Sequence, residues 1–131
     1  MNNCLIVDPS PAMRNAFQNL LAPYHFKVHE VACGVEAMQE CRKNAPDFIL
    51  LSSAMPDMDG LEFLGNLRAT ESGRRVAVLF CSANSNAEAL GQAIDKGAEE
   101  CLMKPFDADL LDFKLRQIGA LPPYDALDMA A

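Results

Sequence analysis

Short apolar runs alternate with stretches of helical periodicity along the whole chain. An unbroken apolar run of four to seven residues is typical of a strand buried on both faces, whereas alternation of apolar and polar residues indicates a half-exposed strand. Strands are predicted at residues 4–7, 26–31, 47–51, 75–81 and 100–103. Only the second of these segments alternates, so we expect it to be half exposed.

Helical spacing of apolar residues fills the intervals between these runs. Helices are predicted from Pro11, capped by Ser10, to Pro23, and at residues 35–44, 60–69, 87–96 and 106 or 107 to 118. Strict alternation of strand and helix predicts an α/β fold, a parallel sheet with helices on both faces. In such folds ligands and chemistry lie at the carboxyl ends of the strands. The periodicity alone leaves the order of the strands open.

Composition narrows the possible functions. The 131 residues suffice for one domain, and the net charge of −7 with scattered basic residues argues against nucleic-acid binding. No apolar run approaches the length of a membrane span, and we expect a cytoplasmic protein without membrane contact. The five cysteines are widely spaced and show no metal or redox motif, so Cys4, Cys81 and Cys101 are expected to be buried thiols. Prolines after residue 118 predict a domain at residues 1–118 and a flexible tail at 119–131.

Polar residues follow four of the predicted strands at regular positions. The segments are Val7-Asp8-Pro9-Ser10, Ser52 with Met55-Pro56-Asp57-Met58-Asp59-Gly60, Phe80-Cys81-Ser82-Ala83, and Met103-Lys104-Pro105-Phe106. In this order and spacing they resemble the receiver domains of bacterial response regulators, over residues 3 to about 118. The resemblance implies a flavodoxin-like (CheY-like) (βα)5 sheet and a non-enzymatic role in two-component signalling or a phosphorelay.

The resemblance also implies a site, which this chain carries only in part. In the family, two acids, the acceptor aspartate and a backbone carbonyl form the Mg²⁺ site. The acceptor aspartate takes the phosphoryl group, and a hydroxyl and a lysine contact that group. Residue by residue, Asp8, Ser82 and Lys104 match the family, and the carbonyl falls on Ala54. Pro9 replaces the second acid and Ser52 replaces the acceptor. The chain therefore resembles a degenerate pseudo-receiver.

The charges of the remaining residues decide what this site can hold. Asp8 and Lys104 contribute −1 and +1, so the excess of carboxylates that attracts Mg²⁺ is missing. We expect weak or absent Mg²⁺ binding and no catalytic residue. An unpaired buried ammonium is costly, so we expect Lys104 to bond either Asp8 or the Ser52 hydroxyl. Asp57 and Asp59, the nearest other carboxylates, are expected in turns.

A candidate partner surface lies on the last two elements. Cys101 occupies the position of an aromatic residue that reports phosphorylation in the family. Leu110 and Phe113 lie off the core stripe of the last helix, which is formed by Leu111, Leu115 and Ile118. Either one of the two side chains is partly buried, or residues 122–124 fold back over the pair, or the pair contacts a partner or a second copy. The acids Asp107, Asp109 and Asp112 around the pair favour a basic partner.

These expectations lead to a functional hypothesis. The chain is a stand-alone pseudo-receiver that associates, without phosphorylation, with a histidine kinase, a phosphotransferase, a diguanylate cyclase or another regulator, and a homodimer is possible. The alternative is an atypical receiver phosphorylated at a non-standard residue in a phosphorelay, and a third hypothesis is a small ligand in the vacated pocket. Met129-Ala130-Ala131 resembles a degradation tag, although an ordinary tail is favoured. The sequence leaves the partner, the pathway and the oligomeric state open.

Overall fold

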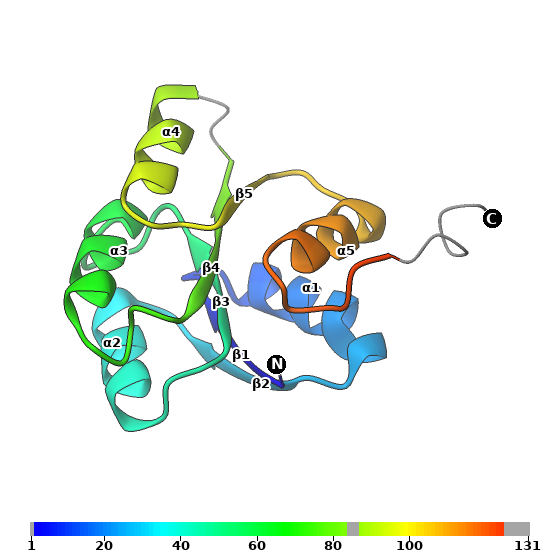
Figure 1. The fold of residues 1–131 in the computed structure, drawn as a ribbon, viewed down its shortest axis with the longest axis horizontal. Helices are drawn as coiled ribbons and strands as arrows, with labels where there is room; N and C mark the ends of the chain where they lie inside the picture. The colour runs from blue at the N-terminus through cyan, green and yellow to red at the C-terminus, as the bar shows by residue number, and fades with distance from the viewer. Residues whose placement is uncertain (1, 84–86, 125–131) are drawn as a thin grey trace.

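Five strands alternate with five α-helices in the computed structural model, which describes residues 2–83 and 87–124 (Figure 1). The strands are β1 (Asn3–Val7), β2 (Lys27–Val31), β3 (Phe48–Ser52), β4 (Ala77–Ser82) and β5 (Glu100–Met103). The helices are α1 (Pro11–Leu21), α2 (Gly34–Lys43), α3 (Gly60–Ala69), α4 (Ala87–Asp95) and α5 (Ala108–Gln117), and a 3-10 turn η1 (Ala22–Tyr24) follows α1. Among the described residues, no helix is both long and apolar enough to cross a membrane.

The strands form one parallel sheet in the order β2-β1-β3-β4-β5. This is the flavodoxin-like order that the resemblance implied and that the periodicity left open. In Figure 1, α2, α3 and α4 cover one face of the sheet and α1 and α5 cover the other. The predicted fold class is confirmed.

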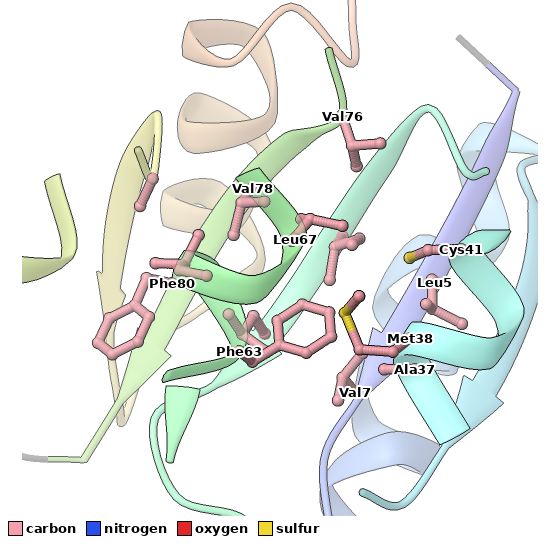
Figure 2. Close-up of a cluster of buried hydrophobic side chains, with 14 of the residues drawn as sticks. Leu5, Val7, Ala37, Met38, Cys41, Phe63, Leu67, Val76, Val78 and Phe80 are labelled. Carbon is pink, nitrogen blue, oxygen red and sulfur yellow. The ribbon is translucent and has the colours of Figure 1, made fainter. Parts of the chain in front are cut away.

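Each face of the sheet has its own apolar cluster, because side chains alternate along every strand. Phe63, Leu64 and Leu67 of α3 pack with Leu5, Val78 and other strand residues on the first face (Figure 2). Phe17 of α1 and Leu111 and Leu115 of α5 fill the second cluster. β1, β3 and β4 are buried almost throughout, whereas β2 is half exposed, as its alternation predicted.

Several element boundaries differ from the prediction by one or two residues, for local reasons. Pro23 does not end α1, which stops at Leu21. Pro23 instead lies in η1, and His25, the residue that caps η1, has a left-handed backbone conformation. Asp47 precedes β3 rather than belonging to it, because its carboxylate accepts the N–H groups of Asn2 and Asn3. Asp107 is the N-cap of α5, and its side chain accepts the Leu110 N–H at 2.8 Å.

Residues 119–124 pack against α5, which corrects the expectation of a flexible segment from residue 119 on. Ala120 is buried, and the hydroxyls of Tyr24 and Tyr124 both donate to Asp112. The Arg116 guanidinium lies 4.3 Å from the centre of the Tyr124 ring and donates to Asp112 at 2.8 Å. These bonds tie η1, α5 and the following segment together. Residues 125–131, with Met129-Ala130-Ala131, lie outside the described residues.

Asp112→Asn should destabilise the protein in a pH-dependent way. The Arg116 guanidinium, with the two tyrosine hydroxyls, lowers the pKa of Asp112 to about 2. A carboxylate with a lowered pKa stabilises the fold above its unfolded pKa, near 4, and loses that contribution as the pH falls toward 2. We expect the variant to lose about 1 kcal/mol in the free energy of unfolding at pH 7, after screening by solvent, and less at pH 3. Urea denaturation at both pH values measures the difference.

Asp109→Asn is the matched control, because Asp109 is exposed on the same helix and has no bond within the described residues. It should change the free energy of unfolding by less than about 0.5 kcal/mol. Equal stability of Asp112→Asn and the wild type at pH 7 would contradict this account of the cluster.

Candidate functional site

Four polar residues of the sequence motifs meet at the carboxyl edge of the sheet. Ser52 and Ser82 end β3 and β4, Asp8 follows β1, and Lys104 follows β5. Asp8, Ser52 and Ser82 are the buried polar residues of the described part of the chain. Burial of polar groups is costly unless they are bonded, so their concentration at one edge marks this edge as the candidate site.

An ion pair between Lys104 and Asp8 lies at the centre of this site. The Lys104 Nζ donates to Asp8 Oδ2 at 3.1 Å, and the Asp8 side chain is only 4% exposed. The other carboxylate oxygen, Oδ1, accepts the Ser10 N–H at 2.9 Å. Of the two partners that the sequence left open for Lys104, the structure has Asp8. Both oxygens of the single site carboxylate are therefore engaged inside the protein.

Ser52 bonds within its own loop. Its hydroxyl donates to the Ala54 carbonyl at 3.0 Å and lies 3.3 Å from the Ala54 N–H, from which it accepts. The loop also packs tightly against α3, because a Cβ on Gly60 would lie 2.6 Å from the Ser52 carbonyl oxygen. The hydroxyl that stands in the acceptor position thus has both a donor and an acceptor partner two residues away.

The site residues do not fit a magnesium ion. Mg²⁺ requires oxygen ligands in near-octahedral geometry and is held in proteins mainly by carboxylates. Here the only site carboxylate is neutralised by Lys104, Pro9 has no ligand atom in its side chain, and the Ala54 carbonyl accepts from Ser52. Within residues 2–83 and 87–124, no three His, Cys, Asp or Glu side chains converge as a metal site. Weak or absent Mg²⁺ binding stays a prediction.

Asp57 and Asp59 have structural roles, as expected from their place in a turn. The Asp57 carboxylate accepts the N–H groups of Gly34 at 2.9 Å and Val35 at 2.8 Å, at the start of α2, and these bonds lower its pKa. Asp59 is the N-cap of α3 and accepts the Glu62 N–H at 2.8 Å. Neither carboxylate is free to replace the missing acceptor.

Arg14 supports the site in a way that the sequence analysis missed. Its Nη1 donates to the Asp8 carbonyl oxygen at 2.7 Å, while its Nε pairs with Glu30 of β2 at 3.1 Å. The only sequence signal was its place one turn into the helix that follows Asp8. The carbonyl of Asp8 and its carboxylate are therefore both fixed by cationic side chains.

Burial raises the pKa of the cysteine thiols on β1, β4 and β5, and one of these thiols is less buried than expected. Cys4 and Cys81 are buried, and burial raises the pKa of Cys81 to about 12. Cys101 on β5 is only half-buried, which corrects the expectation of full burial, and its pKa is also raised by burial. Its Sγ lies 3.8 Å from the Leu90 carbonyl oxygen of α4.

The candidate partner surface on α5 is open. Leu110 is 38% exposed and Phe113 is 47% exposed, whereas Leu111 and Leu115 are buried as predicted. Residues 119–124 pack on the side of α5 that carries Asp112 and Arg116, and they leave the apolar pair exposed. Residues 122–124 therefore do not cover the pair, whereas partial burial of one side chain and contact with a partner both agree with these exposed fractions.

Comparison with known proteins agrees with this arrangement. Residues 4–116 match the response regulator receiver domain family. The chain belongs to that family. The chemotaxis protein CheY of Listeria monocytogenes is 36% identical over 110 residues, which cover 83% of this chain and 91% of that protein. Receiver domains are in general non-enzymatic modules of two-component signalling that interact with kinases and other signalling proteins.

Solved receiver structures share the fold closely. The chemotaxis response regulator CheY4 of Vibrio cholerae has a TM-score of 0.84 at 27% identity, covering 90% of this chain and 98% of that one. The receiver domain of a Pseudomonas aeruginosa sensor histidine kinase has a TM-score of 0.78 at 26% identity, covering 91% and 99%. That structure has a magnesium ion coordinated in its active-site cleft.

Lys104→Met should destabilise this receiver domain by about 2–3 kcal/mol, because it leaves the buried Asp8 carboxylate without its cation. Chemical denaturation at pH 7 measures the loss. Lys114→Met is the matched control, since Lys114 pairs with Glu100 at 2.8 Å in a more exposed place and should cost less than about 1 kcal/mol. Equal losses in the two variants would contradict a special role for the Asp8–Lys104 pair.

Proposed function

We propose that this receiver domain is a pseudo-receiver, which acts in two-component signalling through protein association that does not depend on phosphorylation. The observation that carries the proposal is the Asp8–Lys104 ion pair beside a serine in the acceptor position. This internal pair takes the lysine and the one acid that the family uses on the phosphoryl group and the metal. Nothing in the described site then attracts a phosphoryl donor.

The chemistry of serine supports the same proposal. A hydroxyl needs an adjacent base to become a nucleophile. A phosphate ester on serine is also stable, whereas the acyl phosphate that forms on a carboxylate is labile. The nearest site carboxylate, Asp8, is held by Lys104 and by the Ser10 N–H, while the Ser52 hydroxyl donates to the Ala54 carbonyl. No contact of Ser52 activates it for attack on phosphorus. Phosphorylation at a non-standard residue is therefore disfavoured.

The surface supplies what an association module needs. Two apolar side chains of α5, Leu110 and Phe113, are exposed, and Cys101 on the neighbouring strand β5 is half-buried on the face that α4 covers. Exposed apolar side chains that are close together on a small domain mark interaction sites more often than isolated ones do. The proposed partners are signalling proteins such as a histidine kinase, a phosphotransferase or cyclase, another regulator, or a second copy.

An intact-mass assay with a small-molecule phosphodonor and Mg²⁺ tests this proposal. The wild-type protein should show no phosphoryl adduct, whereas a Pro9→Asp, Ser52→Asp variant should gain one that is lost in mild base. Pro9→Asp, Ser53→Asp is the matched control, because it adds the same charges with the second carboxylate one residue away from the acceptor position. A base-labile adduct on the wild-type protein would overturn the pseudo-receiver and support the atypical phosphoacceptor.

Magnesium titration followed by amide NMR shifts is an independent check. The wild-type protein should show no saturable shifts around Asp8 and Ala54 at millimolar Mg²⁺, since its site pair is neutral. The Pro9→Asp, Ser52→Asp variant should show them, because it restores two carboxylates at the same edge. Saturable shifts of the wild-type site would contradict the proposed loss of the metal site.

A further inference from the structure

A groove of about 440 Å³ lies between α2 and α3, and its lining includes none of Asp8, Ser52, Ser82 and Lys104. Its apolar lining includes Val35 and Met38 of α2 and Met58 of the loop before α3. Met58 packs there because residue 34 is glycine: a Cβ on Gly34 would lie 2.5 Å from Met58 Cγ. The volume is within the range of about 300–1,000 Å³ that is usual for binding clefts.

Arg42 is the one charged residue that lines this groove. It lies in the last turn of α2, is exposed, and has no hydrogen bond or ion pair within the described residues. Arg14, Arg68, Lys104, Lys114 and Arg116, by contrast, are held in ion pairs. A guanidinium binds a carboxylate through two parallel hydrogen bonds, so the groove is suited to an apolar group with an acid beside it.

The α5 patch, formed by Asp109, Leu110 and Phe113, has this chemistry. Leu110 and Phe113 are exposed, and Asp109 lies on the same side of the helix because it precedes Phe113 by four residues. Asp109 is exposed and has no partner within residues 2–83 and 87–124, unlike Asp107 and Asp112, which cap and cross-link the helix. The α5 patch thus presents the apolar side chains and the carboxylate that the α2–α3 groove is suited to bind.

We propose that the α5 patch of one molecule docks in the α2–α3 groove of a second copy. Leu110 and Phe113 cover the apolar lining, and Asp109 pairs with Arg42, as an amphipathic helix does when it binds a groove. The inference rests on the proposed function, because it names a second copy of the chain as the partner of a module that works by association. Complementary charge is what favours a second copy: the groove carries an unpaired cation, Arg42, and the patch carries an unpaired acid, Asp109.

The two surfaces lie on opposite faces of the molecule, which decides the symmetry of the contact. In Figure 1, α2 and α3 cover one face of the sheet and α5 covers the other. A two-fold dimer uses the same patch on both subunits, whereas this contact joins two different surfaces. Each pair therefore keeps one open groove and one open patch, and self-association should grow with protein concentration rather than stop at a dimer.

Analytical ultracentrifugation of the full chain with two blocked variants tests this contact. Ala69→Glu puts bulk and negative charge into the groove at an exposed position, and Phe113→Lys removes the main apolar side chain of the patch. The wild-type protein should form head-to-tail oligomers, and each variant alone should associate at least about tenfold more weakly. A mixture of the two should form one-to-one heterodimers that grow no further, because only one groove and one patch remain intact.

Charge exchange tests the pairing of Arg42 with Asp109. Arg42→Glu alone and Asp109→Arg alone should each weaken association about tenfold, because each leaves like charges facing. The two substitutions in one chain should restore association, because the pair is then reversed. Failure of the double variant to recover would overturn this pairing.

Ile94→Lys is the surface control, because Ile94 is 45% exposed on α4 and lies in neither surface. It should leave association unchanged, and thermal melts should show that all variants fold. A wild-type protein that stays monomeric, association that survives Ala69→Glu, or association lost in Ile94→Lys would each overturn docking of a second copy. None of these results bears on phosphorylation, so the pseudo-receiver is judged separately by the intact-mass assay.

Discussion

The ion pair between Asp8 and Lys104 joins two parts of the chain that are 96 residues apart. Asp8 follows β1 and Lys104 follows β5, while β3 and β4 lie between these two strands in the sheet. The carboxylate is almost fully buried, and a buried charge without a partner would cost several kcal/mol (on the order of 3–5). The arrangement of the whole carboxyl edge therefore depends on this pair.

In the proposed pseudo-receiver, the pair accounts for a receiver fold that needs neither a metal ion nor a phosphoryl group for its charge balance. In a site with an excess of carboxylates, a metal ion or a phosphoryl group compensates the charge. Here one acid and one lysine compensate each other, and the serine in the acceptor position bonds its own loop. Each face of the sheet has an apolar core. Among the described residues, every buried polar side-chain atom also has a hydrogen-bond partner.

Association then becomes the natural output of the domain. The exposed apolar side chains of α5 and the groove between α2 and α3 include neither Asp8 nor Lys104, and they lie on opposite faces of the sheet. Neither surface needs a change at the carboxyl edge in order to be present. A partner that binds them recognises a constant shape, and control of the interaction would come from the concentration of the protein.

The sequence by itself determined the elements and the identity of the site residues. Apolar runs and helical spacing placed all the strands and helices to within a few residues, because burial of one side of each element is a local property of the pattern. The motif spacing identified Asp8, Ser52, Ser82 and Lys104 as residues of one edge, because the strands are parallel. The loss of the acceptor was visible at once, because it is a change of residue type.

Only the tertiary structure decided which of these residues bond to one another and which surfaces of the helices are covered by other segments. The choice of Lys104 between Asp8 and Ser52 depends on the relative positions of distant strand ends, which no local pattern encodes. The same holds for residues 119–124, where the prolines predicted a flexible tail but Asp112 binds tyrosines from both η1 and that segment. The groove between α2 and α3, with Arg42 unpaired in it, likewise arises from the packing of two helices and from a glycine that makes room for Met58. Local patterns set which side of each element is buried, and the three-dimensional fold sets which charged groups meet.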